Sequence, residues 1–247
     1  MRAFLLGLMV GVASGAAFTV AGRAGRAGRA LLAFEPGIDS DTWGALIRLD
    51  GRAEKLVNAF GEIVPLAADL PVTFETCNRA NAYYYLAPPK IVVCYEFMDL
   101  IYELHLPLAS NPEHAIDNTI ATTVGVLAHE LGHAAVRLAD LPIVARSEDV
   151  ADAFAAWFTW KVLKDTEPAV GLGAFWRLLH LTGETGDAND VHSPSDVRAY
   201  NLLCWAYGAG EAPWLDEVLG DRARHCEGEF AEIDSGWRGL LGLGPIE

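Results

Sequence analysis

The stretch from Val124 to Leu138 reads VGVLAHELGHAAVRL, and it decides the fold around it. Its apolar residues recur at steps of three and four, which is the pattern of a helix packed against a core. The residues of this stripe are Val124, Leu127, Leu131, Ala135 and Leu138. His129 and His133 share one face of such a helix, and Glu130 lies beside them. The pattern predicts a zinc site in which the two histidines bind Zn²⁺ and Glu130 is the general base.

The sequence also predicts where this helix begins and ends. Ser110-Asn111-Pro112-Glu113 has the form of a capping box with Pro at the first helical position, which predicts a helix or helix pair over about 112–139. A chance match in surface or core histidines is the alternative to a metal site. The apolar stripe around the motif favours the metal site.

A hydrolytic zinc site usually takes three protein ligands, so a third ligand is needed. A histidine six residues beyond His133 would complete the metzincin pattern, but Ala139 stands there and Val136 replaces the required glycine. The segment 148–152, Glu-Asp-Val-Ala-Asp, opens another helix whose small residues would let it dock against the first. We therefore expect Glu148 as the third ligand and Asp149 as the alternative ligand. Both acids would also complement a helix dipole without any metal.

The spacing of these acids resembles the gluzincin pattern, and the resemblance implies that Asp152 orients His129 from the second shell of the metal. The wider chain resembles a bacterial family of zincin-like HExxH metallopeptidases, a domain of unknown function without an assigned substrate. The motifs that carry this resemblance are Asn81-Ala82-Tyr83-Tyr84, Cys94-Tyr95-Glu96, the His129 motif, Glu148-Asp149 with Ala151-Asp152, and His192-Ser193 followed by Arg198, Asn201, Cys204 and Tyr207-Gly208. It implies a metal-dependent peptidase fold from about residue 50 onward.

His192 is the candidate catalytic residue beyond the metal ligands. It precedes Ser193-Pro194-Ser195-Asp196, which has the signals of a helix start, and a helix is expected from there to about Tyr207. A histidine held at this corner would donate to the oxyanion that forms during hydrolysis. The alternative is an ordinary loop histidine, and geometry must decide between them.

The N-terminus indicates export. Met1-Arg2 and an apolar run to about Val20 form a signal peptide or an N-terminal membrane anchor, followed by a Gly/Arg/Ala-rich tether, so that residues 1–30 precede a single domain over 31–247. The protein is expected to be periplasmic or secreted, with a membrane tether if the segment stays uncut. The net charge of −15 argues against a nucleic-acid partner.

Four cysteines in an exported chain suggest two disulfides. Cys77 and Cys94 flank two strand-like segments, 81–86 and 91–96, joined by a turn at 87–90. A hairpin would bring these cysteines opposite each other and leave Cys204 to pair with Cys226. Cysteine ligation of zinc is the alternative, but the chain has no closely spaced cysteine pair.

Together these observations predict an α+β, zincin-like fold: a small antiparallel sheet over the HExxH helix and a mainly helical C-terminal half, with a less regular tail from residue 209. An edge strand within 78–86 is expected to hold an extended peptide by backbone pairing. The predicted function is zinc-dependent hydrolysis of peptide or amide bonds in a peptide or protein substrate. The alternative is a non-catalytic, exported binding module that zinc merely staples, although such a site has no use for Glu130.

Overall fold

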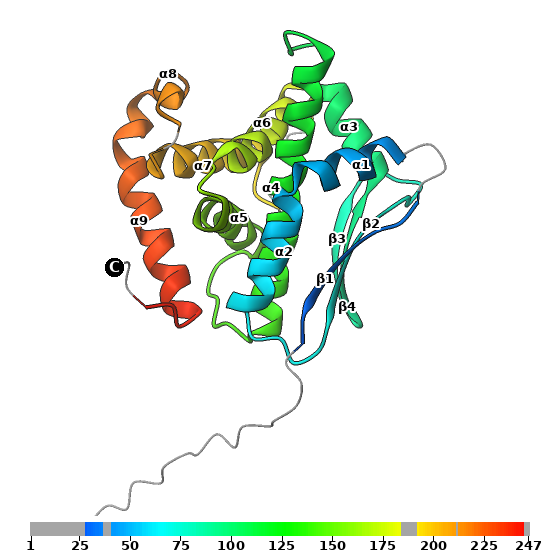
Figure 1. The fold of residues 1–247 in the computed structure, drawn as a ribbon. Coiled ribbons are helices and arrows are strands. Elements are labelled where there is room, and N and C mark those ends of the chain that lie inside the picture. The colour runs from blue at the N-terminus through cyan, green and yellow to red at the C-terminus, as the bar shows by residue number, and fades with distance from the viewer. Residues whose placement is uncertain (1–27, 37–40, 184–191, 211, 245–247) are drawn as a thin grey trace, which may run out of the picture.

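The computed structural model describes residues 28–36, 41–183, 192–210 and 212–244 (Figure 1). Most of the predicted signal or anchor segment, residues 1–27, lies outside this part of the chain. The strands are β1 (Ala30–Phe34), β2 (Leu70–Glu75), β3 (Ala82–Leu86) and β4 (Pro89–Cys94). The helices are α1 (Asp41–Asp50), α2 (Arg52–Ile63), α3 (Tyr95–His105), α4 (Pro112–Leu138), α5 (Ser147–Leu163), α6 (Glu167–Leu181), α7 (Ser195–Gly208), α8 (Asp216–Leu219) and α9 (Ala223–Leu240), with 3₁₀ turns η1 (Pro213–Leu215) and η2 (Gly220–Arg222). The fold is α+β and mostly helical, as predicted.

The four strands form a mixed sheet in the order β1-β2-β4-β3. β1 with β2 and β2 with β4 are parallel pairs, and only β3 with β4 is the predicted antiparallel hairpin. The prediction of an antiparallel sheet was therefore wrong for two of the three pairings. Parallel neighbours need a long crossover, which α1 and α2 supply between β1 and β2. The turn residues of the hairpin predict its antiparallel pairing from the sequence. The parallel pairing across α1 and α2 has no such local sequence signal.

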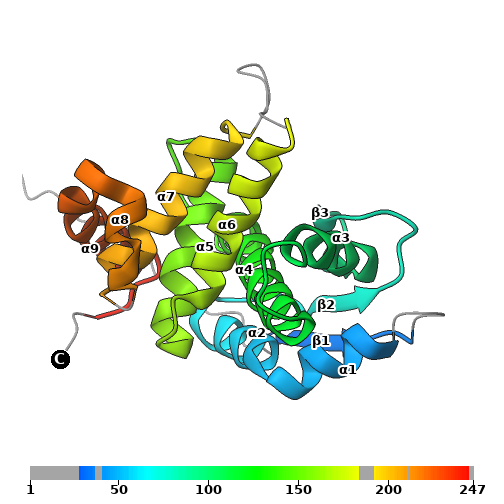
Figure 2. The same ribbon diagram turned by 90° about the horizontal axis from the view of Figure 1, so that it is seen from above.

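α4 lies in the middle of the molecule, between the sheet on one side and the C-terminal helices on the other (Figures 1 and 2). It packs against α3 and β3 toward the sheet and against α5 and α6 on its far side. This central position explains why the middle of α4, including His129 and Glu130, is buried almost all round. α7 packs on α6, and α9 packs on α7.

The start of α4 lies where it was predicted, but its capping side chain is not the serine of the capping box. Asn111, not Ser110, is the N-cap, and its side-chain oxygen accepts a hydrogen bond of 2.8 Å from the backbone N–H of His114. Pro112 occupies the first helical position as predicted, because the proline lacks an N–H that the first turn would leave unpaired. α4 is one continuous helix of 27 residues, so the predicted alternative of a helix pair is excluded.

The C-terminal region is more regular than predicted, because α9 fills residues 223–240. Its buried residues Cys226, Phe230 and Trp237 recur at helical spacing. Phe230 and Trp237 pack on aromatic residues of α5, and Cys226 is bonded to Cys204 of α7. The glycines that suggested an irregular tail, such as Gly228 and Gly236, have nothing within 4 Å of an added Cβ. Tertiary packing therefore overrides the low helix propensity of glycine.

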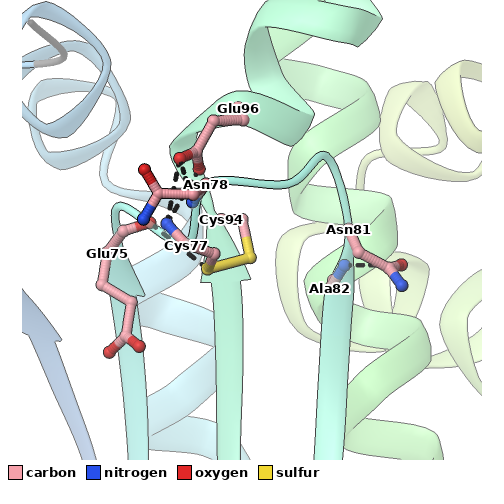
Figure 3. The surroundings of a disulfide bond; sticks show 7 residues. All are labelled: Glu75, Cys77, Asn78, Asn81, Ala82, Cys94 and Glu96. Carbon is pink, nitrogen blue, oxygen red and sulfur yellow. Dashed lines mark hydrogen bonds between the residues drawn. A yellow bond between two sulfur atoms is a disulfide. The ribbon is translucent and has the colours of Figure 1, made fainter.

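Both predicted disulfides are present, Cys77–Cys94 and Cys204–Cys226. The first joins the loop after β2 to the end of β4, where the Glu96 carboxylate accepts hydrogen bonds from the backbone N–H groups of Cys77 and Asn78 (Figure 3). The second joins α7 to α9. Two disulfides fit an oxidising compartment. In the described part of the chain, no helix is both long and apolar enough to cross a membrane.

Candidate metal centre

Two helices bring the predicted site residues together. α4 presents His129 and His133 one turn apart, and the first turns of α5 place Glu148 and Asp152 opposite them. The helices approach closely at Gly132, where an added Cβ would lie 3.0 Å from the Cα of Ala151. The small residues expected to allow this docking therefore do so.

The donor atoms of three residues converge. His129 Nε2 lies 3.2 Å from His133 Nε2 and 3.2 Å from Glu148 Oε2, and His133 Nε2 lies 3.4 Å from Glu148 Oε1. A tetrahedral ion with ligand bonds of about 2.0–2.1 Å requires its donors to be roughly 3.4 Å apart. Two imidazoles and one carboxylate at these separations therefore fit Zn²⁺ by both chemistry and spacing.

The charges around the donors also favour a cation. Burial by itself would lower the pKa of His129, but hydrogen bonds to Asp152 and Glu148 outweigh it and raise the pKa to about 9. Burial would raise the pKa of Glu148, but the neighbouring histidines hold it far below its usual range. The carboxylates thus attract positive charge to this point, and a bound cation would take the place of the proton.

Glu130 is buried, with an exposed fraction of 8%, and it lines the same cavity as the three donors. Burial raises its pKa above the usual range of a glutamate. A carboxylate whose pKa moves toward neutrality is a better general base at neutral pH. The position and environment of Glu130 therefore suit the role predicted for it.

Asp152 orients the His129 ring through the ring nitrogen that does not face the other donors. The Nδ1–H of His129 donates to Asp152 Oδ1 at 2.8 Å, which is the contact that the gluzincin resemblance implied. Arg198 of α7 in turn donates from Nε and Nη2 to the two Asp152 oxygens, each at 2.7 Å. Burial would raise the pKa of Asp152, but Arg198 holds it below its usual range. The face of Trp176 covers the guanidinium at 3.7 Å.

Sequence reasoning missed this role of Arg198. The signal was present, because Arg198 shares helical spacing with Leu202 and Trp205, both of which are buried. An arginine on a buried helix face needs a carboxylate partner, since an unpaired buried charge is very costly. Only the structure shows that the partner is Asp152.

The other predicted site residues, His192, Asp149 and the cysteines, do not belong to the three-residue donor cluster. His192 is at the rim, with a side chain 46% exposed and its Nε2 3.3 Å from Glu148 Oε2. Among the described residues, the cluster whose ligand atoms all lie within 4.8 Å of one another contains His129, His133 and Glu148, but not His192 or Asp149. The cysteines lie beside Glu96 in a second cluster, but as a disulfide they offer no thiolate.

Comparison with known families identifies the class of this protein. The chain belongs to the family DUF4344, described as "Putative metallopeptidase", whose profile matches residues 39–241. The match covers strands β2 to β4 and all helices from α1 to α9, and it begins after β1. The family description implies a hydrolase that uses a metal. No curated protein and no solved structure matches the chain.

Proposed function

We propose that the protein is a zinc-dependent metallopeptidase of the zincin type. One observation carries the proposal: the two ring nitrogens of His129 and His133 and the carboxylate of Glu148 lie 3.2 to 3.4 Å from one another in a cavity that Glu130 also lines. A structural zinc site is closed by four protein ligands and needs no base. The three-donor cluster with an adjacent carboxylate favours the enzyme over the zinc-stapled binding module.

Each residue has a defined task in the proposed reaction. Bound Zn²⁺ would supply a Lewis acid that polarises a carbonyl group and makes a water molecule more acidic. Glu130 takes a proton from that water as its oxygen attacks the carbonyl carbon, and passes the proton to the nitrogen as the C–N bond breaks. Asp152 keeps the His129 ring oriented, and Arg198 holds Asp152. His192, at the rim, donates to the carbonyl oxygen of the substrate.

The edge strand β3 is the proposed docking line for the substrate backbone. β3 is the last strand of the sheet in the described part of the chain, so one of its edges has no strand beside it there. The hydrogen bond from the N–H of Cys94 to the carbonyl of Asn81 fixes which residues of β3 direct their backbone groups toward β4. By alternation, Tyr83 pairs with Val92, while the N–H and C=O of Tyr84 point away from the sheet. Tyr84 also lines the cavity of the metal centre, so an extended peptide paired there would pass the donors.

The proposed place of action is outside the reducing cytosol. Two disulfides in the folded domain require an oxidising compartment to form and persist. The basic and apolar N-terminal residues support export by a signal peptide or an anchor.

The test combines metal content with turnover. Elemental analysis after dialysis should find one zinc per wild-type chain, one zinc per Glu130→Gln chain and none in Glu148→Ala. Peptide hydrolysis should be present only in the wild type, because Glu130→Gln keeps the ligands and loses the base. Full activity in Glu130→Gln, or a wild type that takes up no zinc on reconstitution, would refute the proposal.

A further inference from the structure

The metal centre lies where two cavities meet. An inner cavity of about 310 Å³ is lined by residues of β3, α3, α4, α6 and α7, together with Glu148 and His192. An outer cavity of about 400 Å³ is lined by β3, the end of α4, the loop that follows it and the start of α5. The two cavities share Tyr84, His133 and Glu148. A ligand that occupies both cavities therefore has to cross the donor atoms.

One part of the lining of the inner cavity is apolar. Its apolar residues come from three helices and are Phe97 of α3, Val126 of α4, and Leu172, Phe175 and Trp176 of α6. Phe175 meets Phe97 edge to face at 5.4 Å and Trp176 at 5.2 Å, so the aromatic rings support one another. Phe175 and Leu172 are each 2% exposed, which means that their neighbours hold them firmly. A volume near the lower limit for ligand sites suits one bulky apolar side chain.

Among the described lining residues, the buried charged groups of the two cavities already have a partner or a role. The carboxylates among the described lining residues are Glu130 and Glu148, which serve as base and ligand. The arginines are Arg198, which Asp152 holds by two hydrogen bonds, and Arg137, which is exposed on the outer side. Among the described residues of the inner cavity, a charged chain terminus would thus find no uncommitted buried counter-charge, and burying an unpaired charge is costly.

We infer that the protein is an endopeptidase that cleaves within a polypeptide, next to a large apolar side chain seated in the inner cavity. The inference rests on the proposed function and goes beyond it by naming the substrate class. The substrate is an extended segment without a terminus at the donors, its backbone along Tyr84. The substrate residues on one side of the cleaved bond occupy the inner cavity, and those on the other side leave through the outer cavity.

The test uses decapeptides with an acetylated N-terminus and an amidated C-terminus, which differ only in one central residue. The central residue is Leu, Phe or Trp in one set and Gly, Asp or Lys in the other. Zinc-loaded wild type should cleave the blocked peptides internally, beside the central residue. The apolar set should be cleaved with kcat/KM higher by roughly 10- to 100-fold, which corresponds to the burial of one such side chain.

Two variants of the inner cavity test the assignment of the subsite. Val126→Phe fills the cavity and should move the preference toward small residues. Phe97→Leu enlarges it and should raise the cleavage of Trp peptides relative to Leu peptides. Val218→Phe, on exposed α8 and away from both cavities, is the matched control and should leave the preference unchanged.

The outcomes separate this inference from the proposed function. Cleavage of free-ended peptides with blocked peptides spared would identify an exopeptidase and overturn the inference alone. Cleavage of blocked peptides without a preference that follows Val126→Phe or Phe97→Leu would overturn the assigned subsite. If zinc-loaded wild type cleaves no peptide, blocked or free, the proposed function fails, and this inference fails with it.

Discussion

Arg198 contributes to the candidate metal centre through Asp152 without touching the donor atoms. Its side chain and that of Asp152 are each 2% exposed, and the two share two charge-assisted hydrogen bonds. Asp152 then accepts from His129, so one buried chain of contacts runs from α7 through α5 to α4. Within this chain, the loss of one partner leaves the next charge buried without a counterpart.

Arg198→Met should therefore destabilise the fold strongly. Loss of one partner of a buried ion pair costs about 3–5 kcal/mol of unfolding free energy, and loss of outer-shell support lowers metal affinity by about 10- to 100-fold. Urea unfolding and zinc titration measure the two effects. Arg224→Met is the control, because that arginine has a side chain 63% exposed in a surface pair and should cost less than about 1 kcal/mol. Equal effects of the two substitutions would contradict the role of Arg198.

Glu96 gives the loop after β2 a pH-dependent anchor. Burial would raise its pKa, but hydrogen bonds from the backbone N–H groups of Cys77 and Asn78 outweigh it and lower the pKa. A carboxyl with a lowered folded pKa stabilises the fold above its unfolded pKa of about 4.3 and loses that contribution as the pH falls through the folded value. The stability gap between wild type and Glu96→Gln should therefore be largest near neutral pH and shrink below about pH 4. Urea unfolding across this pH range measures the gap, and a gap that stays constant speaks against the anchor.

At the scale of the elements, close contact between α4 and α6 places the apolar wall beside the donors. The contact depends on Gly125 of α4, where an added Cβ would lie 2.2 Å from the carbonyl oxygen of Pro168 on α6. Gly171 of α6 makes the reciprocal approach, with Thr122 of α4 2.7 Å from an added Cβ. Small residues on both helices thus set how near Leu172 and Phe175 come to the metal centre.

Gly125→Ala should destabilise the protein, although alanine favours a helix interior by about 1 kcal/mol over glycine. The added methyl group forces α4 and α6 apart, and overpacking of this kind costs about 1–3 kcal/mol. Gly228→Ala in α9 is the matched control, because nothing lies within 4 Å of its added Cβ, and it should stabilise by about 0.5–1 kcal/mol. Thermal unfolding distinguishes the two substitutions, and a stabilising Gly125→Ala would contradict the close contact.

At the scale of the whole molecule, the metal centre and the disulfides connect separate layers. The donors join α4 to α5, Cys77–Cys94 joins the loop after β2 to the end of β4, and Cys204–Cys226 joins α7 to α9. A ligand that binds only the folded chain adds to its stability by mass action. In the proposed enzyme, zinc therefore stabilises the central helix pair as well as activating water.

Removal of zinc by a chelator should lower the melting temperature of the wild type. At a free zinc concentration of about 1,000 times Kd, the linkage contributes about 4 kcal/mol, which corresponds to roughly 10 °C for a domain of this size. Glu148→Ala should show no such shift, because it lacks the third ligand. Calorimetry with and without chelator measures both proteins. An equal shift of the melting temperature in the wild type and in Glu148→Ala would mean that the stabilising metal binds at another site.

What the sequence by itself determined is local in the chain. The spacing of His129 and His133 on a helix follows from the 3.6-residue period. The hairpin follows from the turn residues at 87–90, although its second strand lies at Pro89–Cys94 and not at the predicted 91–96. The pairing of Cys77 with Cys94 was predictable because that hairpin brings both ends together. These features need only the geometry of one element or of two neighbouring elements.

The tertiary structure alone decided the features that join distant segments. Asp152 and Arg198 are 46 residues apart, and neither residue type nor spacing says that they meet. The same holds for the parallel pairing of β1 with β2, for the packing that makes α9 a helix, and for the apolar wall that α3, α4 and α6 build together. Such contacts depend on how whole faces of helices and sheet pack into one core, and the period of a single segment carries no information about its partner.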